Sequence, residues 1–192
     1  MKFLRHYHDS YISYFLMYFF FFFSLAFFSG FISVYLMDQG YSASQVSFVV
    51  SCSYILSVIG QPFIGQLNDQ YESRYVNSIL LLTAGILGLI FIFLKNIYLI
   101  ALTYSMVLAI TNGTNPIIER MAIVSRFKYG SIRVWATIGY AVATMISGYL
   151  YKNIGPYSLY ISFVIGELLC VIGILGTHSI CLLYTSPSPR DQ

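Results

Sequence analysis

Six long apolar stretches, separated by short polar breaks, make up most of this 192-residue chain. A helix needs about 20 apolar residues to cross the hydrocarbon core of a bilayer. The stretches have about this length and run over residues 11–37, 45–67, 75–94, 97–123, 131–151 and 157–176. They predict an all-α membrane protein with six transmembrane helices. The phenylalanine run Phe19–Phe23 is expected to face lipid and to supply packing bulk.

Composition excludes a soluble globular chain. Hydrophobic residues are 58% of the sequence and charged residues only 9%, with a mean hydropathy of +0.74, whereas soluble domains carry about 25% charged residues. The net charge of +3 is scattered along the chain and indicates no nucleic-acid partner. Cys52 and Cys170 lie in apolar stretches without a CxxC motif or a histidine cluster. We therefore expect no disulfide, metal or cofactor.

Lysine and arginine predict the orientation, because they collect on the cytoplasmic side of membrane proteins. If the N-terminus is inside, this side receives Lys2, Arg5, Arg74, Arg120, Arg126, Lys128 and Arg133, and the other side receives Lys95 and Lys152. Both ends of the six-helix unit are thus expected in the cytoplasm of a multi-pass cell-membrane protein. The first stretch is too long for a signal peptide and has no cleavage site, so we expect it to remain as a helix.

Glu119 and Arg133 place one acid and one base inside the fourth and fifth apolar stretches. Each such charge costs roughly 3 kcal/mol to insert and usually has a partner. The turn between the stretches centres near Arg126, seven residues from both. At about 1.5 Å of rise per residue, both lie on the order of 10 Å into the membrane. The spacing predicts an intramembrane ion pair in a polar-solute pathway, and a purely structural buried pair is the alternative.

Two further polar patterns flank this pair. Asn112, Asn115 and Glu119 share one helix face, which favours either the lining of a cavity or a bridge between helices. Tyr140 follows Arg133 by seven residues, on the same face and about two turns deeper. An aromatic ring beside a charged fork suits a sugar or a nucleoside, and simple packing is the alternative role for this tyrosine.

Glu167 lies near the middle of the sixth apolar stretch. Acids at that depth are usually functional. We interpret Glu167 as a candidate proton site or substrate site, or as a group paired with a further part of the protein. The sequence alone names no partner for it within this chain.

Three patches resemble the N-terminal half of a major facilitator superfamily transporter, in the branch of lactose permease and other oligosaccharide or nucleoside proton symporters. The first is the phenylalanine-rich opening stretch. The second, residues 61–69, resembles the superfamily loop motif G-x-x-x-D-[RK]-x-G-x-[RK]: Gly65, Asp69 and Arg74 match it, whereas Gln70 and Glu72 depart from it. The third holds residues 115–119 and 130–133. There Glu119 and Arg133 stand where lactose permease has an essential Glu and Arg, and Tyr140 stands where it stacks a tryptophan on sugar.

This resemblance implies proton symport of a small polar solute by alternating access between two six-helix halves. It implies that Gly65, Asp69 and Arg74 form a conformational latch on the cytoplasmic side. Physically, Gly65 would let the turn pack closely, and Asp69 would accept backbone donors at a helix N-terminus. The expected partners are the solute, H⁺, the lipid bilayer and a second six-helix half.

Other functions stay open from the residues alone. An uncoupled facilitator and a non-transporting membrane sensor or structural protein are the alternatives. An enzyme is disfavoured, because no cluster of His, Asp and Glu stands at a membrane face and the short loops leave no room for a soluble domain.

The last residues interrupt this pattern. Residues 181–191, CLLYTSPSPRD, can be back-translated into a sequence that resembles a transposase adapter of sequencing libraries. A genuine Ser/Pro-rich linker is the alternative. We therefore expect residues 1–180 to be a six-helix domain, residues 181–192 to be a non-native tail, and the native sequence to continue into a second half.

Overall fold

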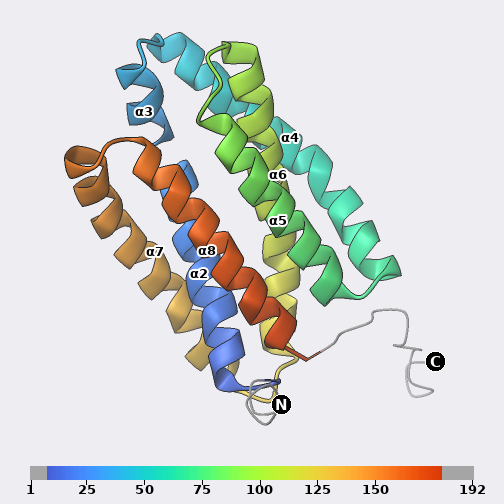
Figure 1. Ribbon diagram of the computed structural model, residues 1–192. Coiled ribbons are helices and arrows are strands. Elements are labelled where there is room, and N and C mark those ends of the chain that lie inside the picture. The colour runs from blue at the N-terminus through green and yellow to red at the C-terminus, as the bar shows by residue number, and fades with distance from the viewer. Residues whose placement is uncertain (1–7, 179–192) are drawn as a thin grey trace.

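The computed structural model describes residues 8–178, and every regular element in this range is an α-helix. These helices are α2 (Tyr11–Ser29), α3 (Ile32–Asp38), α4 (Ala43–Gln70), α5 (Ser73–Phe91), α6 (Ile97–Ile123), α7 (Tyr129–Asn153) and α8 (Tyr157–Gly176). The long helices lie side by side in one bundle (Figure 1), which confirms the predicted all-α class. The expected adapter tail lies outside the described residues.

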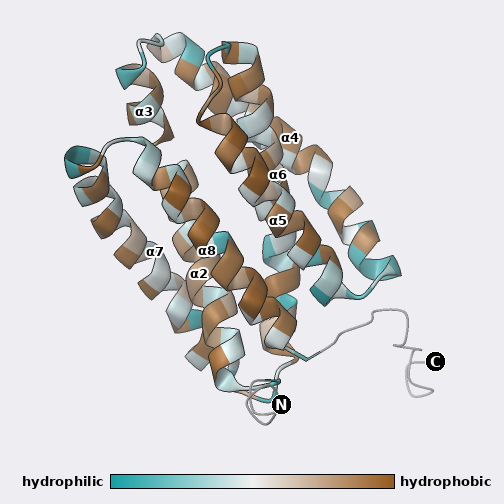
Figure 2. Cartoon of the chain, in the orientation of Figure 1, coloured by the Kyte–Doolittle hydropathy of each residue, from teal (hydrophilic) through white to brown (hydrophobic). Residues whose placement is uncertain are grey.

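Five segments of the described chain are long and apolar enough to cross a membrane. They are Tyr11–Asp38, Ala43–Gln70, Ser73–Phe91, Ile97–Ile123 and Tyr157–Gly176. The remaining predicted span, α7, is a helix of 25 residues but is more polar than the other five. Figure 2 shows paler residues along α7 than on the largely apolar α5 and α8. That α7 crosses the membrane, and the orientation of the bundle, therefore stay predictions.

The first predicted helix is broken at Gly30 and Phe31, which divide it into α2 and α3. Just before the break, the Ser29 hydroxyl donates a hydrogen bond of 2.7 Å to the Leu25 carbonyl. Such a side-chain bond competes with the helical backbone, and a Ser–Gly pair is a common cause of a kink. The first span consequently consists of two helical pieces.

The helices do not pack in chain order. The extensive contacts join α4 to α6, α2 to α8, α2 to α7, α5 to α8 and α5 to α6. Across the bundle the order is therefore α7, α2, α8, α5, α6, α4, and Figure 1 shows α7 and α4 at opposite sides of the bundle. If α2 is exchanged with α6, α4 with α7 and α5 with α8, the same five helix pairs are in contact. The bundle is thus built from two three-helix units with equivalent packing, a repeat that the sequence did not reveal.

Helix α2 lies between α7 and α8, and this position corrects one expectation. Within Phe19–Phe23, Phe21 is fully buried and the other four side chains are half-buried. The run therefore supplies packing bulk inside the bundle, and Phe21 within it does not face lipid. Large apolar side chains such as Phe93 and Met145 are exposed instead. They give the bundle the apolar exterior that a bilayer covers.

Two glycines let neighbours approach α2 closely. A Cβ atom at Gly139 of α7 would lie 2.3 Å from the Phe19 carbonyl oxygen. A Cβ atom at Gly173 of α8 would lie 2.4 Å from the Met17 backbone nitrogen. Small residues serve this purpose in membrane bundles, where close packing replaces the hydrophobic drive between helices. The α2–α7 contact is important for the site, because it fixes α7 beside the opening helix.

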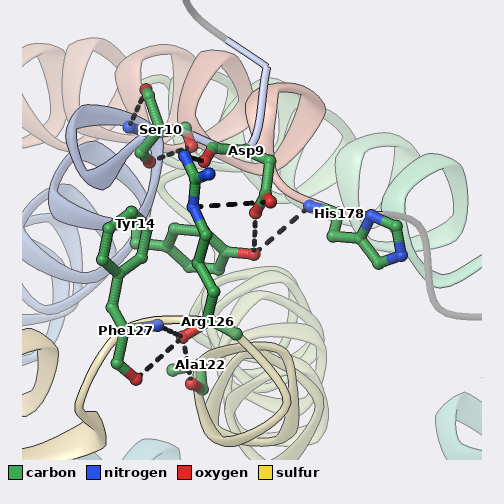
Figure 3. Close-up of polar contacts among 9 residues, drawn as sticks. Asp9, Ser10, Tyr14, Ala122, Arg126, Phe127 and His178 are labelled. Carbon is green, nitrogen blue, oxygen red and sulfur yellow. Dashed lines mark hydrogen bonds and ion pairs between the residues drawn. The ribbon is translucent and has the colours of Figure 1, made fainter.

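A polar cluster around Asp9 joins three segments at one end of the bundle (Figure 3). The Asp9 carboxylate lies 3.6 Å from Arg126 Nε in the α6–α7 turn and accepts a 3.1 Å hydrogen bond from the Tyr14 hydroxyl. The Asp9 backbone N–H donates to the Gly176 carbonyl at 2.8 Å. The Tyr14 hydroxyl accepts from the His178 backbone N–H at 3.3 Å. The described chain therefore begins and ends at the same end of the bundle.

Candidate functional site

Glu119 and Arg133 form the predicted ion pair between α6 and α7. Arg133 Nη1 lies 2.6 Å from Glu119 Oε1. The same carboxylate oxygen accepts a 2.5 Å hydrogen bond from the Tyr129 hydroxyl. The tyrosine oxygen in turn accepts from Arg133 Nη1 at 2.8 Å. The three side chains therefore close a cycle in which one acid, one base and one phenol orient each other.

Tyr129 was missed by the sequence analysis. It begins α7 and precedes Arg133 by four residues, so both side chains lie on one helix face. The Arg133 guanidinium also lies over the Tyr129 ring, 5.9 Å from its centroid. A polar aromatic residue one turn from an intramembrane arginine was the signal that could have identified it.

The ion pair is not enclosed by the bundle. The Arg133 side chain is 51% exposed and the Glu119 side chain 40% exposed. Exposure of both charges to hydrocarbon would be expensive. This face of α6 and α7 therefore suits contact with water, with a polar solute or with another protein surface.

A hollow of about 500 Å³ extends from the ion pair along α7. Its lining residues are Phe22 of α2 with Arg133, Ala136, Thr137, Tyr140, Ala141 and Thr144 of α7. Arg133 and Tyr140 thus share one hollow, as their seven-residue spacing predicted. The volume lies within the range of about 300–1,000 Å³ that is usual for small-molecule sites. Phe22 is a second member that sequence reasoning missed, because nothing distinguishes it within a run of five phenylalanines.

The two asparagines of α6 are not among the residues that line this hollow. Asn112 Nδ2 donates a 3.1 Å hydrogen bond to Ser57 Oγ on α4. Its side chain therefore bridges two helices, which is the alternative that the sequence left open. Asn115 is half-buried, one turn before Glu119.

Glu167 is separate from this cluster. It lies on α8, where its side chain is 1% exposed among α2 and α5. Glu167 Oε1 lies 2.9 Å from Ser24 Oγ on α2. The structure thus provides the partner that the sequence did not name, and this partner is a neutral hydroxyl.

The loop-motif residues behave differently from the physical expectations. A Cβ atom at Gly65 would meet no atom of the described chain within 4 Å, so Gly65 does not mediate close packing here. Asp69 is exposed in the last turn of α4, and the residue that precedes α5 is Glu72, so Asp69 does not cap that helix. Arg74 pairs with Glu72 at 2.5 Å and donates to the Thr177 carbonyl at 3.2 Å. It therefore ties the start of α5 to the end of α8.

A buried amide pair beside this motif was not foreseen. Asn77 Nδ2 on α5 donates a 2.7 Å hydrogen bond to Asn68 Oδ1 on α4. Asn68 Nδ2 donates to the Ile64 carbonyl at 2.9 Å, and both asparagines are fully buried. The α4–α5 turn is thus held by amides, although the motif suggested its glycine and aspartate.

The apolar bundle, with a charged and aromatic hollow on one face, defines a polytopic helical membrane protein with a solute-sized polar site. Comparison with known proteins makes the class specific. Residues 11–189 match the MFS_1 like family, and the chain belongs to this family. The predicted resemblance to a major facilitator transporter is thereby confirmed, and the chain is a multi-pass protein of the cell membrane.

Three relatives illustrate the similarity. The uncharacterized transporter YwbF of Bacillus subtilis (strain 168) is 27% identical over 155 residues, which are 77% of this chain and 38% of that protein. A maltose permease of Geobacillus stearothermophilus is 24% identical over 69% of this chain and 35% of its own length. A lactose permease of Klebsiella oxytoca is 27% identical over 64% of this chain and 32% of its own length. The chain spans about a third of the length of these relatives, and no solved structure matches it.

Proposed function

We propose that this chain is the N-terminal six-helix half of a twelve-helix secondary transporter in the plasma membrane. Its substrate is a small polar solute, a sugar or a nucleoside, which it carries together with a proton by alternating access. The observation that carries this proposal is the hollow that Arg133 and Tyr140 share beside Glu119. Relatives named as maltose and lactose permeases support the solute class.

The hollow offers the groups that a sugar or nucleoside needs. Arg133 uses Nη1 for Glu119 and Tyr129, and its Nε and Nη2 groups make no hydrogen bond within residues 8–178. These three N–H donors are free to bind solute hydroxyls, and charge-assisted hydrogen bonds of this kind are among the strongest. Tyr140 and Phe22 line the same hollow and supply aromatic faces for the apolar side of a ring.

The acid serves mainly to hold the arginine. Glu119 and Tyr129 fix the guanidinium through Nη1, so that its other donors are held at the hollow that Arg133 lines. Pre-organisation of this kind improves affinity, because less freedom is lost on binding. We assign Asn115 and the Asn112–Ser57 bridge a supporting part in positioning α6.

The polarity of α7 follows from the same proposal. Arg133, Thr137, Tyr140 and Thr144 line the hollow and lower the apolar character of the helix. In a two-half transporter this face would meet the second half and the solute, and would not meet lipid. On this basis α7 also crosses the membrane, and Gly65, Asp69 and Arg74, on either side of the α4–α5 turn, would act as a cytoplasmic latch.

Uptake into liposomes that contain the complete transporter tests the proposal. A panel of labelled disaccharides, monosaccharides and nucleosides is offered with and without an inward proton gradient. The expected result is uptake of at least one of these solutes, raised by the gradient. Folded, inserted protein that neither binds nor moves any member of the panel would contradict the proposed solute class.

A further inference from the structure

Glu167 is a buried acid that takes no part in the proposed solute site. Its side chain is 1% exposed, at the place where α8 meets α2 and α5. Ser24 of α2 is fully buried beside it. A Cβ atom at Gly85 of α5 would lie 3.9 Å from Glu167 Cβ, so the acid is packed from that side as well.

The single hydroxyl hydrogen of Ser24 constrains the protonation state of Glu167. Ser24 Oγ lies 2.9 Å from Glu167 Oε1 and also 2.9 Å from the Phe21 carbonyl oxygen. A serine hydroxyl has one hydrogen and can donate to only one of these acceptors. Both short distances are satisfied if Glu167 carries a proton and donates it to Ser24 Oγ, while Ser24 donates to Phe21. With an ionised Glu167, one of the two contacts would bring acceptor against acceptor.

The second carboxyl oxygen leads to the same conclusion. Glu167 Oε2 is buried and has no hydrogen-bond partner within the described residues. Glu167 lines a hollow of about 210 Å³ between α5 and α8, whose other lining residues are Leu82, Gly85, Ile86, Leu89, Val164 and Leu168. An unpaired charge in such apolar surroundings is far more costly than a neutral carbonyl oxygen.

Among the residues that the structure describes, no cation pairs with Glu167. The ion pairs within residues 8–178 are Arg74–Glu72, Arg126–Asp9 and Arg133–Glu119, and none includes Glu167. The titratable groups that come nearest along the packed helices are Tyr18 on α2, Tyr75 on α5, Tyr140 on α7 and Cys170 on α8. Tyr18 lies six residues before Ser24 and Tyr75 ten before Gly85, about 9 and 15 Å along the helices. The Cys170 thiol donates to the Met17 carbonyl.

We propose that Glu167 is an intramembrane proton-binding site, in which the protonated acid donates a hydrogen bond to Ser24 Oγ and Ser24 donates to the Phe21 carbonyl. The ligand is H⁺, and the bound form is the neutral carboxylic acid. Loss of the proton leaves a carboxylate, which needs water or a cation that this packing does not supply. A movement of α8 relative to α2 or α5 that admits water would therefore release the proton. Only the role in coupling rests on the proposed function; the proton site itself does not.

Reaction with a membrane-soluble carbodiimide tests the proton site in the complete protein in liposomes. A carboxylic acid adds across one C=N bond of this reagent: its oxygen bonds the central carbon and its proton passes to nitrogen. Acids that stay protonated in apolar surroundings are therefore labelled preferentially. We expect labelling of Glu167 in the natural protein, equal labelling of Glu167 in Glu119→Gln, and loss of this label in Glu167→Gln. Undiminished labelling of Glu167→Gln would overturn the proposal.

Infrared spectroscopy covers the case in which the reagent does not reach the α5–α8 hollow. A protonated carboxyl has a carbonyl stretching band that a carboxylate lacks. The band should be present at neutral pH in the natural protein and in Glu119→Gln, and absent in Glu167→Gln. If no band depends on Glu167, the acid is ionised and the proposal is wrong.

Transport assays distinguish a role of Glu167 in proton coupling from proton binding alone. In the natural protein a proton gradient should drive solute accumulation. Glu167→Gln should lose this accumulation and still exchange solute across the membrane, because exchange does not require the proton to leave. Unaltered accumulation by this variant would remove Glu167 from coupling. A natural protein that moves no solute would instead contradict the proposed function and leave the labelling result intact.

Discussion

Glu119 and Glu167 are the same residue type, both in apolar helices, yet their surroundings differ at every point. Glu119 is 40% exposed, pairs with Arg133 at 2.6 Å and accepts from Tyr129. Glu167 is 1% exposed and contacts only the Ser24 hydroxyl through Oε1, with Oε2 unpaired among the described residues. The first site can keep a charge and the second favours a proton. Intramembrane acids are thus distinguished by their partners and not by their depth.

The difference divides two tasks between two regions of one bundle. The α6–α7 face presents charge and aromatic rings in a hollow of solute size. The contact region of α2, α5 and α8 presents one buried acid in apolar surroundings. A charged pair binds a hydroxylated solute well, whereas a neutral acid that can be exposed to water suits a proton. Variants that exchange or remove the partners of each acid test this division.

Replacement of Arg133 should have the largest effect on solute binding. Lysine keeps the charge but offers a point donor in place of the planar fork. Loss of about two charge-assisted hydrogen bonds, each about 1.5–3 kcal/mol, predicts affinity lower by about a hundredfold or more. Equilibrium binding to Arg133→Lys in the complete transporter measures this, with Arg126→Lys in the nearby turn as the matched control. Near-natural affinity of the Arg133 variant would remove this arginine from the site.

The two acid-to-amide variants compare the regions directly. Glu119→Gln leaves Arg133 without its counter-charge, and loss of one partner of a close pair costs about 2 kcal/mol or more. Solute affinity should therefore fall by roughly thirtyfold. Glu167→Gln should bind solute like the natural protein, because Glu167 does not line the solute hollow. Equal loss in both variants would mean that the two regions are one site.

Truncation of Tyr140 should have a smaller effect. Removal of the ring in Tyr140→Ala loses an aromatic contact of about 0.5–1.5 kcal/mol beyond the buried area, so affinity should fall by about tenfold. Tyr140→Phe keeps the ring and serves as the matched control, with affinity close to natural. If both variants bind equally, stacking on this face contributes nothing to recognition.

Tyr129→Phe should have the smallest effect. It removes two hydrogen bonds of the cycle but leaves the Glu119–Arg133 pair in place. A net loss of about 1 kcal/mol predicts affinity lower by about fivefold. The same binding assay checks this value. A loss as large as that of Arg133→Lys would make Tyr129 a direct ligand and would sharpen the site around it.

Local spacing was sufficient for the helices and for the ion pair. The bounds of α6 and α8 agree with the predicted stretches at residues 97–123 and 157–176. Glu119 and Arg133 meet because seven residues separate each from the turn. These features depend on composition and on helix rise, which a sequence encodes directly.

Contacts between distant segments were not accessible in the same way. Ser24 and Glu167 are 143 positions apart, and no periodicity relates them. The break after Ser29 and the burial of Phe21 depend on how α2 packs between α7 and α8. The buried Asn68–Asn77 pair likewise depends on the angle of one turn. Tertiary packing decides such features, so they became visible only in the folded chain.

Solute protection of a single cysteine tests the central claim most directly. In a transporter without its natural cysteines, Thr137→Cys places a thiol in the Arg133–Tyr140 hollow, and Thr83→Cys places one on the exposed surface of α5. The account predicts that the transported solute slows alkylation at position 137, leaves position 83 unchanged, and does so equally in a Glu167→Gln background. Unslowed alkylation at position 137 during saturating solute binding would contradict the assignment of this hollow as the solute site.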